Sequence, residues 1–272
     1  MFINRCFFII CMTILLLLAI ASSALAAPFE FTITAKTAFE KMIKAVDSTT
    51  SYALTSRYAE FQKLQQQAID WDLKISTIHY DNDAEEEALR KKIPGIDSVR
   101  ITTATNEVNT TKKKYESLFE LYETQKSQLR LAKAAKNKSL TSFFNAQVEV
   151  TKIAVQSAKD TIRAKEAKLK ETKAAATAKM KQIRDILGTN DATSTKIKAS
   201  KSTISSTNKR VTTETKVLTN AVKKGDATAA LSSLMRLVLY QNEILIQKIN
   251  IHGYELVIQG VIKKASTKLK SF

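Results

Sequence analysis

The stretch LSSLMRLVLYQNEILIQKINIHGYELVIQGVI, residues 231–262, decides how the rest of the chain is interpreted. Its apolar residues recur at helical spacing but cover more than one stripe, and such a helix needs either several neighbouring helices or a membrane. The charged residues Arg236, Glu243 and Lys248 interrupt the stretch. Because a charge at the centre of a membrane span costs about 2.5–3.5 kcal/mol, we predict a buried central helix, about residues 227–268, against which the other helices close.

The composition favours long, uninterrupted helices. The 272 residues include only five glycines and two prolines, whereas a mainly β chain needs many more turn residues. We therefore predict an all-α fold, an elongated up-and-down bundle of about five long helices with coiled-coil-like heptad packing. The predicted helices are residues 35–78, 97–136, 140–187, 194–223 and 227–268, with a short helix at 84–92.

Apolar residues at steps of three and four predict the seams along which these helices meet. The clearest run is Phe61, Leu64, Ala68, Trp71, Ile75 and Ile78, and this spacing keeps one face of a helix turned towards a partner helix. The residues predicted to form the core seam are Phe61, Leu64, Trp71, Ile75, Leu118, Tyr122, Val238, Leu245, Ile249 and Leu256.

The seam of residues 101–132 loses its phase beside Asn137-Lys138-Ser139. This predicts the end of one helix and the start of the next, with Asn137 adopting positive φ and Ser139 capping. The alternative is a stutter within a single helix of about 90 residues.

The N-terminal residues 1–26 have the pattern of a signal peptide. Arg5 precedes the apolar run of residues 6–20, and Ala24-Leu25-Ala26 is a small-x-small sequence at which a signal peptidase cleaves. We predict cleavage after Ala26, a secreted protein, and one elongated domain over residues 27–272. An uncleaved membrane anchor is the alternative, although the apolar run is short for a span of about 20 residues.

Positive charge is concentrated in the C-terminal two-thirds of the chain. The whole sequence has a net charge of +17, and residues 97–272 carry 33 basic and 15 acidic residues. This predicts attraction to an anionic polymer, a membrane surface or an acidic protein partner. A cluster of basic and aromatic residues that would stack nucleobases is missing, which argues against nucleic acid.

We place the anion-binding face on the helix at 194–223, where a solvated outer helix is the alternative interpretation. The candidate residues of this face are Lys196, Lys198, Lys201, Lys209, Arg210 and Lys216.

The sequence contains no pattern typical of a catalytic or metal site. Both cysteines, Cys6 and Cys11, lie in the predicted signal peptide, so the remaining chain has no thiol nucleophile. The two histidines, His79 and His252, lie in different segments, whereas zinc needs three or four clustered ligands. A Gly-rich phosphate loop and a G-x-S-x-G elbow are also missing. We predict a non-enzymatic protein with no cofactor and no metal.

Two resemblances bear on function. The segment NKSLTSFFNAQVEV, residues 137–150, with the following helix as far as Leu187-Gly188, resembles the repeat of outer-membrane efflux ducts of the TolC type over about a fifth of the chain. The sequence has neither the second copy nor the alternating strands that this resemblance implies. In size and helix number it also resembles helical pore-formers of the haemolysin E type, but within residues 227–268 the longest fully apolar run, residues 237–240, has only four residues.

We therefore expect a secreted structural or interaction protein that acts through a basic surface on an anionic cell-envelope, matrix or protein partner. The alternative is a membrane-active helical bundle, either pore-forming or lipid-binding. The heptad seams also allow a homo-oligomer.

Overall fold

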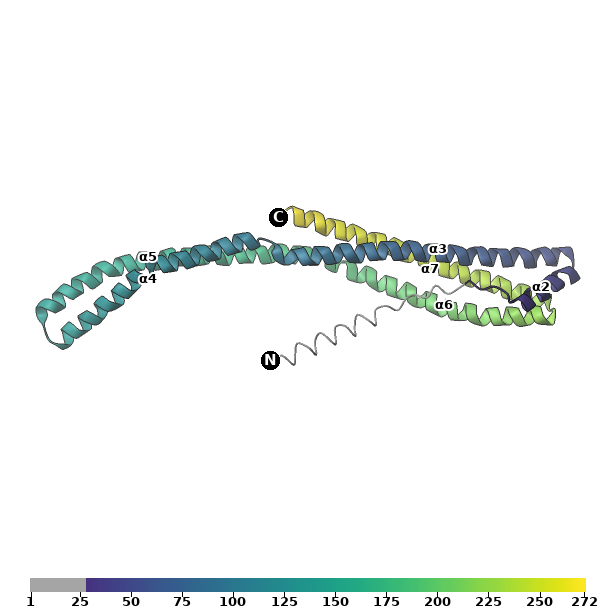
Figure 1. Cartoon of the computed structure of the whole chain (residues 1–272), viewed down its shortest axis with the longest axis horizontal. Coiled ribbons are helices and arrows are strands. Elements are labelled where there is room, and N and C mark those ends of the chain that lie inside the picture. Colours follow the sequence, from purple (N-terminus) through teal and green to yellow (C-terminus); the bar gives the residue numbers. More distant parts are fainter. Residues whose placement is uncertain (1–27) are drawn as a thin grey trace. The chain divides into compact units, whose positions relative to one another are not determined.

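A computed structural model describes residues 28–272, and within that range the chain is helical without strands. The predicted all-α class is therefore confirmed for these residues. The elements are α2 (Ile33–Ala45), α3 (Ser48–Lys92), the 3-10 helix η1 (Ile93–Gly95), α4 (Ser98–Ala134), α5 (Lys138–Gly188), α6 (Asn190–Lys224) and α7 (Ala227–Lys270) (Figure 1). The predicted signal peptide lies outside the described residues.

The described chain forms two compact units rather than the single domain predicted from the sequence. Unit 1 contains residues 28–82 and Asp191–Ile258, and unit 2 contains Asp83–Asn190 and Gln259–Phe272. Within unit 2, α4 and α5 form a hairpin and pack against each other. That all the long helices close around residues 227–268 stays a prediction.

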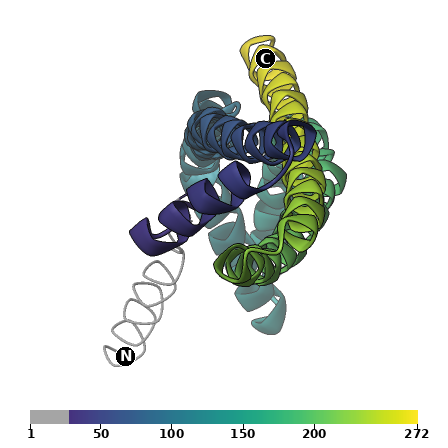
Figure 2. The same cartoon turned by 90° about the vertical axis from the view of Figure 1, so that its right-hand side faces the viewer.

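The core of unit 1 lies where α2, α3, α6 and α7 meet. Figures 1 and 2 show α2 at the same end of this unit as the turn between α6 and α7. Phe61 of α3, Leu218 of α6 and Leu234 and Leu237 of α7 are completely buried there. The aromatic rings of Phe29, Phe31 and Tyr58 pack against this cluster. Burying an apolar side chain of this size stabilises the fold by about 1.5–3 kcal/mol.

The buried face of α7 is not the predicted one. Its buried positions follow one another at steps of three and four and are Ala230, Leu234, Leu237, Gln241, Ile244, Lys248, Ile251, Glu255, Ile258, Ile262 and Ala265. Val238 is also buried, and Leu245 packs against the core. Ile249 and Leu256, however, are 43% and 49% exposed. The buried stripe carries a polar residue every seven positions, which hides it from an apolar-spacing search.

The inner face of α6 is also partly polar. Ile197, Ser200, Ile204, Thr207, Val211, Glu214, Leu218 and Ala221 are its buried or half-buried positions at steps of three and four. The apolar residues Ile197, Ile204, Val211 and Leu218 are seven positions apart. Lys201, Asn208 and Thr215 lie four positions after the first three of them, and only Thr215 is buried. The residues that share the inner face lie one position earlier. Small hydroxyl side chains fit there because a helical Ser or Thr hydroxyl can bond to its own helix backbone.

Two segments of α2 and α3 differ from the expected boundaries. The predicted helix 35–78 is interrupted at Val46, which is extended, and Asp47 starts α3 by accepting hydrogen bonds from the backbone N–H (3.0 Å) and hydroxyl (2.6 Å) of Thr50. The predicted loop with a short helix at 84–92 is instead the last part of α3. Ion pairs between residues four apart, such as Glu86–Arg90 at 2.6 Å, support that part. The 3-10 helix at Pro94-Gly95 then ends it.

Unit 2 is dominated by the α4–α5 hairpin. The residues of α4 buried against α5 include Ala104, Val108 and Ala132, and those of α5 include Val148, Val155 and Ala158. Leu118 and Tyr122, which were predicted in the core seam, are half-buried. In unit 1 the seam residues Trp71 and Ile75 are half-buried as well, whereas Leu64 is buried.

Candidate interaction surfaces

All six residues of the predicted anion-binding face on α6 are exposed, but they do not share one face. Lys198, Lys209 and Lys216 are separated by 11 and 7 residues, about three and two helical turns, so they point in the same direction. Arg210 lies on another side, where its guanidinium pairs with Glu243 of α7 at 3.2 Å and covers the Tyr240 ring at 4.0 Å. Lys196 approaches the Tyr254 ring at 5.8 Å. The candidate face is therefore divided between solvent and α7.

A second basic surface surrounds the turn of the α4–α5 hairpin. Residues 124–148 contain no acidic residue. Their five basic residues, all exposed, are Lys126, Arg130, Lys133, Lys136 and Lys138. Glu123 lies just outside this segment and pairs with Lys126 at 3.0 Å. We call residues 124–148 the hairpin end. Charge counts alone do not single out the hairpin end, because residues 192–213 on α6 also carry five basic residues and no acidic residue.

The turn of the hairpin end is closed by local hydrogen bonds. Lys136 adopts left-handed backbone geometry with φ = 52°. The N–H of Asn137 donates to the Ala132 carbonyl (3.2 Å), and the Asn137 side chain caps α5 by accepting from the Leu140 N–H (3.0 Å). The chain thus breaks beside Asn137, but the positive φ and the cap each lie one or two residues earlier than predicted. This tight turn holds Lys133, Lys136 and Lys138 close together.

Apolar side chains are exposed beside these basic groups. Leu131 is 64% exposed, Phe143 is 55% exposed and Val150 is 72% exposed. On α5, Phe143 and Val150 lie on a different side from Val148, which is buried against α4. Scattered exposed apolar residues are ordinary on protein surfaces, but here they accompany a cluster of positive charge that has no acidic residue within it.

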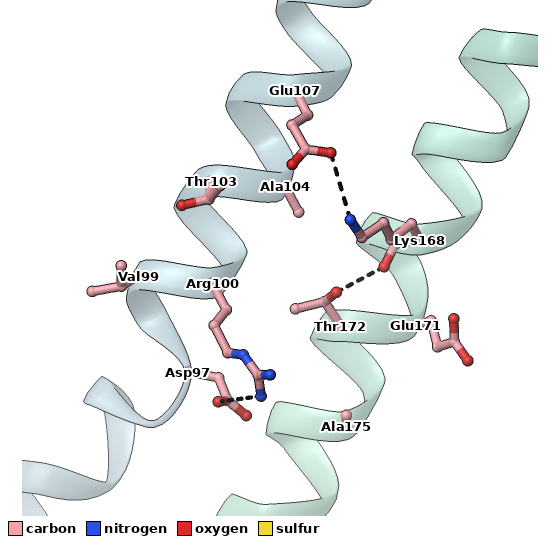
Figure 3. A pocket seen from close by; sticks show the side chains of 10 residues that line it. All are labelled: Asp97, Val99, Arg100, Thr103, Ala104, Glu107, Lys168, Glu171, Thr172 and Ala175. Atoms are coloured by element: carbon pink, nitrogen blue, oxygen red, sulfur yellow. Dashed lines mark hydrogen bonds and ion pairs between the residues drawn. The ribbon is translucent and has the colours of Figure 1, made fainter.

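Several of the charges that line the groove between α4 and α5 near η1 have partners, because Asp97 pairs with Arg100 and Glu107 with Lys168 (Figure 3). The groove has a volume of about 510 Å³. Lys179 donates to Asp97 at 2.6 Å, and Lys165 donates to Glu107 at 3.0 Å. These lysine hydrogen bonds hold the pKa of both carboxyl groups below their ordinary values. These two hydrogen bonds thus join α4 and α5.

A second cluster of polar groups is buried inside unit 1. The Glu255 carboxylate accepts hydrogen bonds from His79 Nδ1 at 3.0 Å and from Asn82 Nδ2 at 2.9 Å. Burial by itself raises the pKa of Glu255. The hydrogen bonds from His79 and Asn82 lower this pKa, as do the charges of His79 and Lys201. Together these lowering effects are larger than the effect of burial, so the pKa of Glu255 lies below its ordinary value. Lys248, one heptad earlier, pairs with Asp72 and donates to the Ala68 carbonyl at 3.1 Å.

These buried groups serve packing between α3 and α7. His252, the other histidine, packs its ring edge-on against Trp71, with 5.2 Å between the ring centroids. Across residues 28–272 there is no group of three or more His, Cys, Asp or Glu placed to hold a metal ion. Over the same range, none of the helices combines the length and apolarity that crossing a membrane requires.

No protein-family model matches this chain, and no match was found among curated proteins or solved structures.

Proposed function

We propose that this chain is a secreted, non-enzymatic helical interaction protein that binds an anionic partner through the basic hairpin end. The observation that carries the proposal is the exposed group of five basic residues in a 25-residue segment with no acidic residue. Elsewhere the basic residues are more often neutralised: Arg210 pairs with Glu243, Arg236 with Glu214 and Lys179 with Asp97.

The elements supply a rigid support for this surface. An α-helix of 37 residues, the length of α4, is about 55 Å long, so the turn lies far along the hairpin from η1. The buried positions of α4 and α5 recur mostly at steps of three, four and seven. We propose coiled-coil-like packing of the hairpin, which would hold the turn in one conformation.

A membrane surface is the second candidate partner, because of the exposed apolar residues of the hairpin end. Basic residues beside Leu and Phe side chains are typical of segments that lie at the surface of anionic membranes. Each Lys or Arg near such a surface contributes about 1 kcal/mol, and Leu131, Leu140 and Phe143 would enter the boundary between headgroups and acyl chains. This is interfacial binding, which needs no spanning helix.

Charge-removal variants of residues 27–272, the chain expected after cleavage, test the proposal. We would compare Lys133→Gln/Lys136→Gln/Lys138→Gln at the hairpin end with Lys198→Gln/Lys209→Gln/Lys216→Gln on α6, two sets of three exposed lysines. Binding to a sulfated polysaccharide would be measured at fixed low salt. The three lysines of the hairpin end should contribute about 3 kcal/mol of binding free energy, so their replacement should weaken binding about 100-fold. The α6 variant should lose much less affinity.

Two results would overturn the proposal. If the α6 variant lost most of the affinity, the anion-binding face would lie where the sequence first placed it. If the unsubstituted chain bound neither the polysaccharide nor anionic vesicles at low salt, the chain would not be an anion-binding protein.

A further inference from the structure

The face of α7 opposite the core carries a second apolar stripe, and this stripe is exposed. Its large residues are Met235, Leu239, Ile246, Ile249 and Leu256, each between 43% and 67% exposed. Asn242, Gly253 and Gly260 complete a series at uninterrupted steps of three and four from 235 to 260. Ile249 and Leu256, which were predicted in the core seam, thus belong to a continuous outer stripe along about 37 Å of helix.

The geometry of α7 directs this stripe away from unit 1. Leu239 and Ile246 each lie two positions after a buried residue, Leu237 and Ile244. Two positions on an α-helix correspond to about 200°, so the outer stripe faces almost opposite to the buried one. It is therefore a helix face to which another helix can be added without opening the core.

The chemistry of the outer stripe suits an uncharged helical partner. None of its eight positions is charged. The nearest exposed charges are already engaged within unit 1, because Arg236 pairs with Glu214 at 2.8 Å and Glu243 pairs with Arg210 at 3.2 Å. An anionic surface would gain no charge complementarity here. A helix whose apolar residues also repeat every 3.5 positions would match the stripe along its length.

The outer stripe is complementary in size to itself when two copies run antiparallel. We place the two-fold axis that relates the two copies between positions 247 and 248. Met235 then faces Gly260 of the other copy, and Asn242 faces Gly253. Leu239 then faces Leu256, and Ile246 faces Ile249. Large residues thus meet glycines at two of the four pairings, which is how facing helix positions interdigitate.

No contact within the described structure explains why positions 253 and 260 are glycine. A glycine inside a helix costs about 0.5–1 kcal/mol relative to alanine. At both Gly253 and Gly260, no atom beyond the adjoining turns of α7 lies within 4 Å of the position that a Cβ would occupy, so packing among the described residues requires neither glycine. In the antiparallel pair, Asn242 and Met235 of the other copy would fill the space beside Gly253 and Gly260. We propose that the chain forms a homodimer through an antiparallel pair of α7 helices joined along the outer stripe.

Disulfide cross-linking tests the orientation directly, because residues 27–272 contain no cysteine. Leu239→Cys and Leu256→Cys variants would be prepared separately and oxidised alone or as a mixture. In the antiparallel dimer, positions 239 and 256 are adjacent across the interface, whereas each is about 25 Å along the axis from its own copy. A disulfide requires Cα atoms within about 7 Å. We therefore expect a cross-linked dimer from the mixture and very little from either variant alone.

Other outcomes would contradict the proposal. Efficient cross-linking of each variant with itself would indicate a parallel pair. No cross-linking, together with a monomer in sedimentation equilibrium at tens of micromolar, would show that the outer stripe does not bind a second copy and is left for unit 2 or a different protein.

An Ile246→Asp variant provides an independent measurement. Ile246 is 56% exposed, so the substitution should keep the helicity measured by circular dichroism while raising the dimer dissociation constant at least 100-fold. Val99→Asp, at a 76% exposed position of α4, is the matched control and should leave the dimer unchanged. Binding of a short anionic oligosaccharide should survive in the Ile246→Asp variant, so that failure of the dimer and failure of the proposed anion binding can be distinguished.

Discussion

Lys136 adopts the left-handed backbone conformation at the end of α4, a geometry in which most residues other than glycine are strained by about 1–2 kcal/mol. Glycine usually occupies this position after a helix. We expect Lys136→Gly to stabilise the hairpin by about 1 kcal/mol, measured as an increase in the free energy of unfolding by urea. Lys133→Gly removes the same charge from within α4 and should destabilise it by about 1 kcal/mol. Equal effects of the two substitutions would contradict the turn geometry.

The buried Glu255 should make unit 1 sensitive to acid. Because its folded pKa lies below the ordinary value, its stabilising contribution is complete above about pH 4.3, the unfolded pKa of glutamate, and is lost as the pH falls through the folded pKa. Glu255→Gln should lower the free energy of unfolding at pH 7 by about 2 kcal/mol. The difference between the two proteins should shrink below about pH 4.3. A difference that stays constant down to pH 3 would show that the His79 and Asn82 hydrogen bonds do not depend on the carboxylate charge.

At the scale of single elements, two neighbouring residues test which face of α6 is buried in the core. Leu218 is completely buried, whereas Val217 is 41% exposed. Leu218→Ala should lower the free energy of unfolding by about 2–5 kcal/mol, and Val217→Ala should change it by no more than about 0.5 kcal/mol. If thermal unfolding shifted equally in both variants, the face of α6 that packs against α7 would be assigned incorrectly.

Sequence patterns predicted the helical elements better than their buried faces. Phe61 and Leu64 are both buried, and their 3/4 spacing has no competing stripe. In α7 two stripes compete, and the outer stripe contains no charge whereas the buried one contains Gln241, Lys248 and Glu255. Apolar spacing therefore placed Ile249 and Leu256 of the outer stripe among the predicted core residues, together with Val238 and Leu245, which do contact the core. Only the positions of His79, Asn82 and Asp72 on α3 show that the buried charges have partners.

The surfaces were predictable only in part for a similar reason. The charge count placed the excess of basic residues in residues 97–272, a range that includes both α6 and the hairpin end. Which lysines share a face, and which lie beside an acidic residue of another helix, depends on pairing between segments far apart in the sequence. Arg210 with Glu243 of α7 is an example.

For the whole molecule, the two proposed surfaces act together. The outer stripe, apart from Gly260, belongs to unit 1 and the hairpin end to unit 2, so one dimer would carry two hairpin ends. Two linked sites bind a dense anionic surface more tightly than one, provided that both can engage at once. We expect Ile246→Asp to weaken binding to anionic vesicles more than tenfold while leaving the affinity for a short anionic oligosaccharide unchanged. An equal affinity of both proteins for vesicles would mean that dimerisation does not contribute.

The central claim, that the hairpin end contacts the anionic partner, is tested most directly by a fluorescent reporter placed there. The chain has one tryptophan, Trp71. In residues 27–272 carrying Trp71→Phe, we would introduce either Phe143→Trp at the hairpin end or Val99→Trp on α4, both at exposed positions. Vesicles with and without anionic lipid would then be added. We predict a blue shift and increased intensity for Trp at position 143 with anionic vesicles only, reversed by high salt, and no change at position 99. Binding of the vesicles without any change at position 143 would contradict the account.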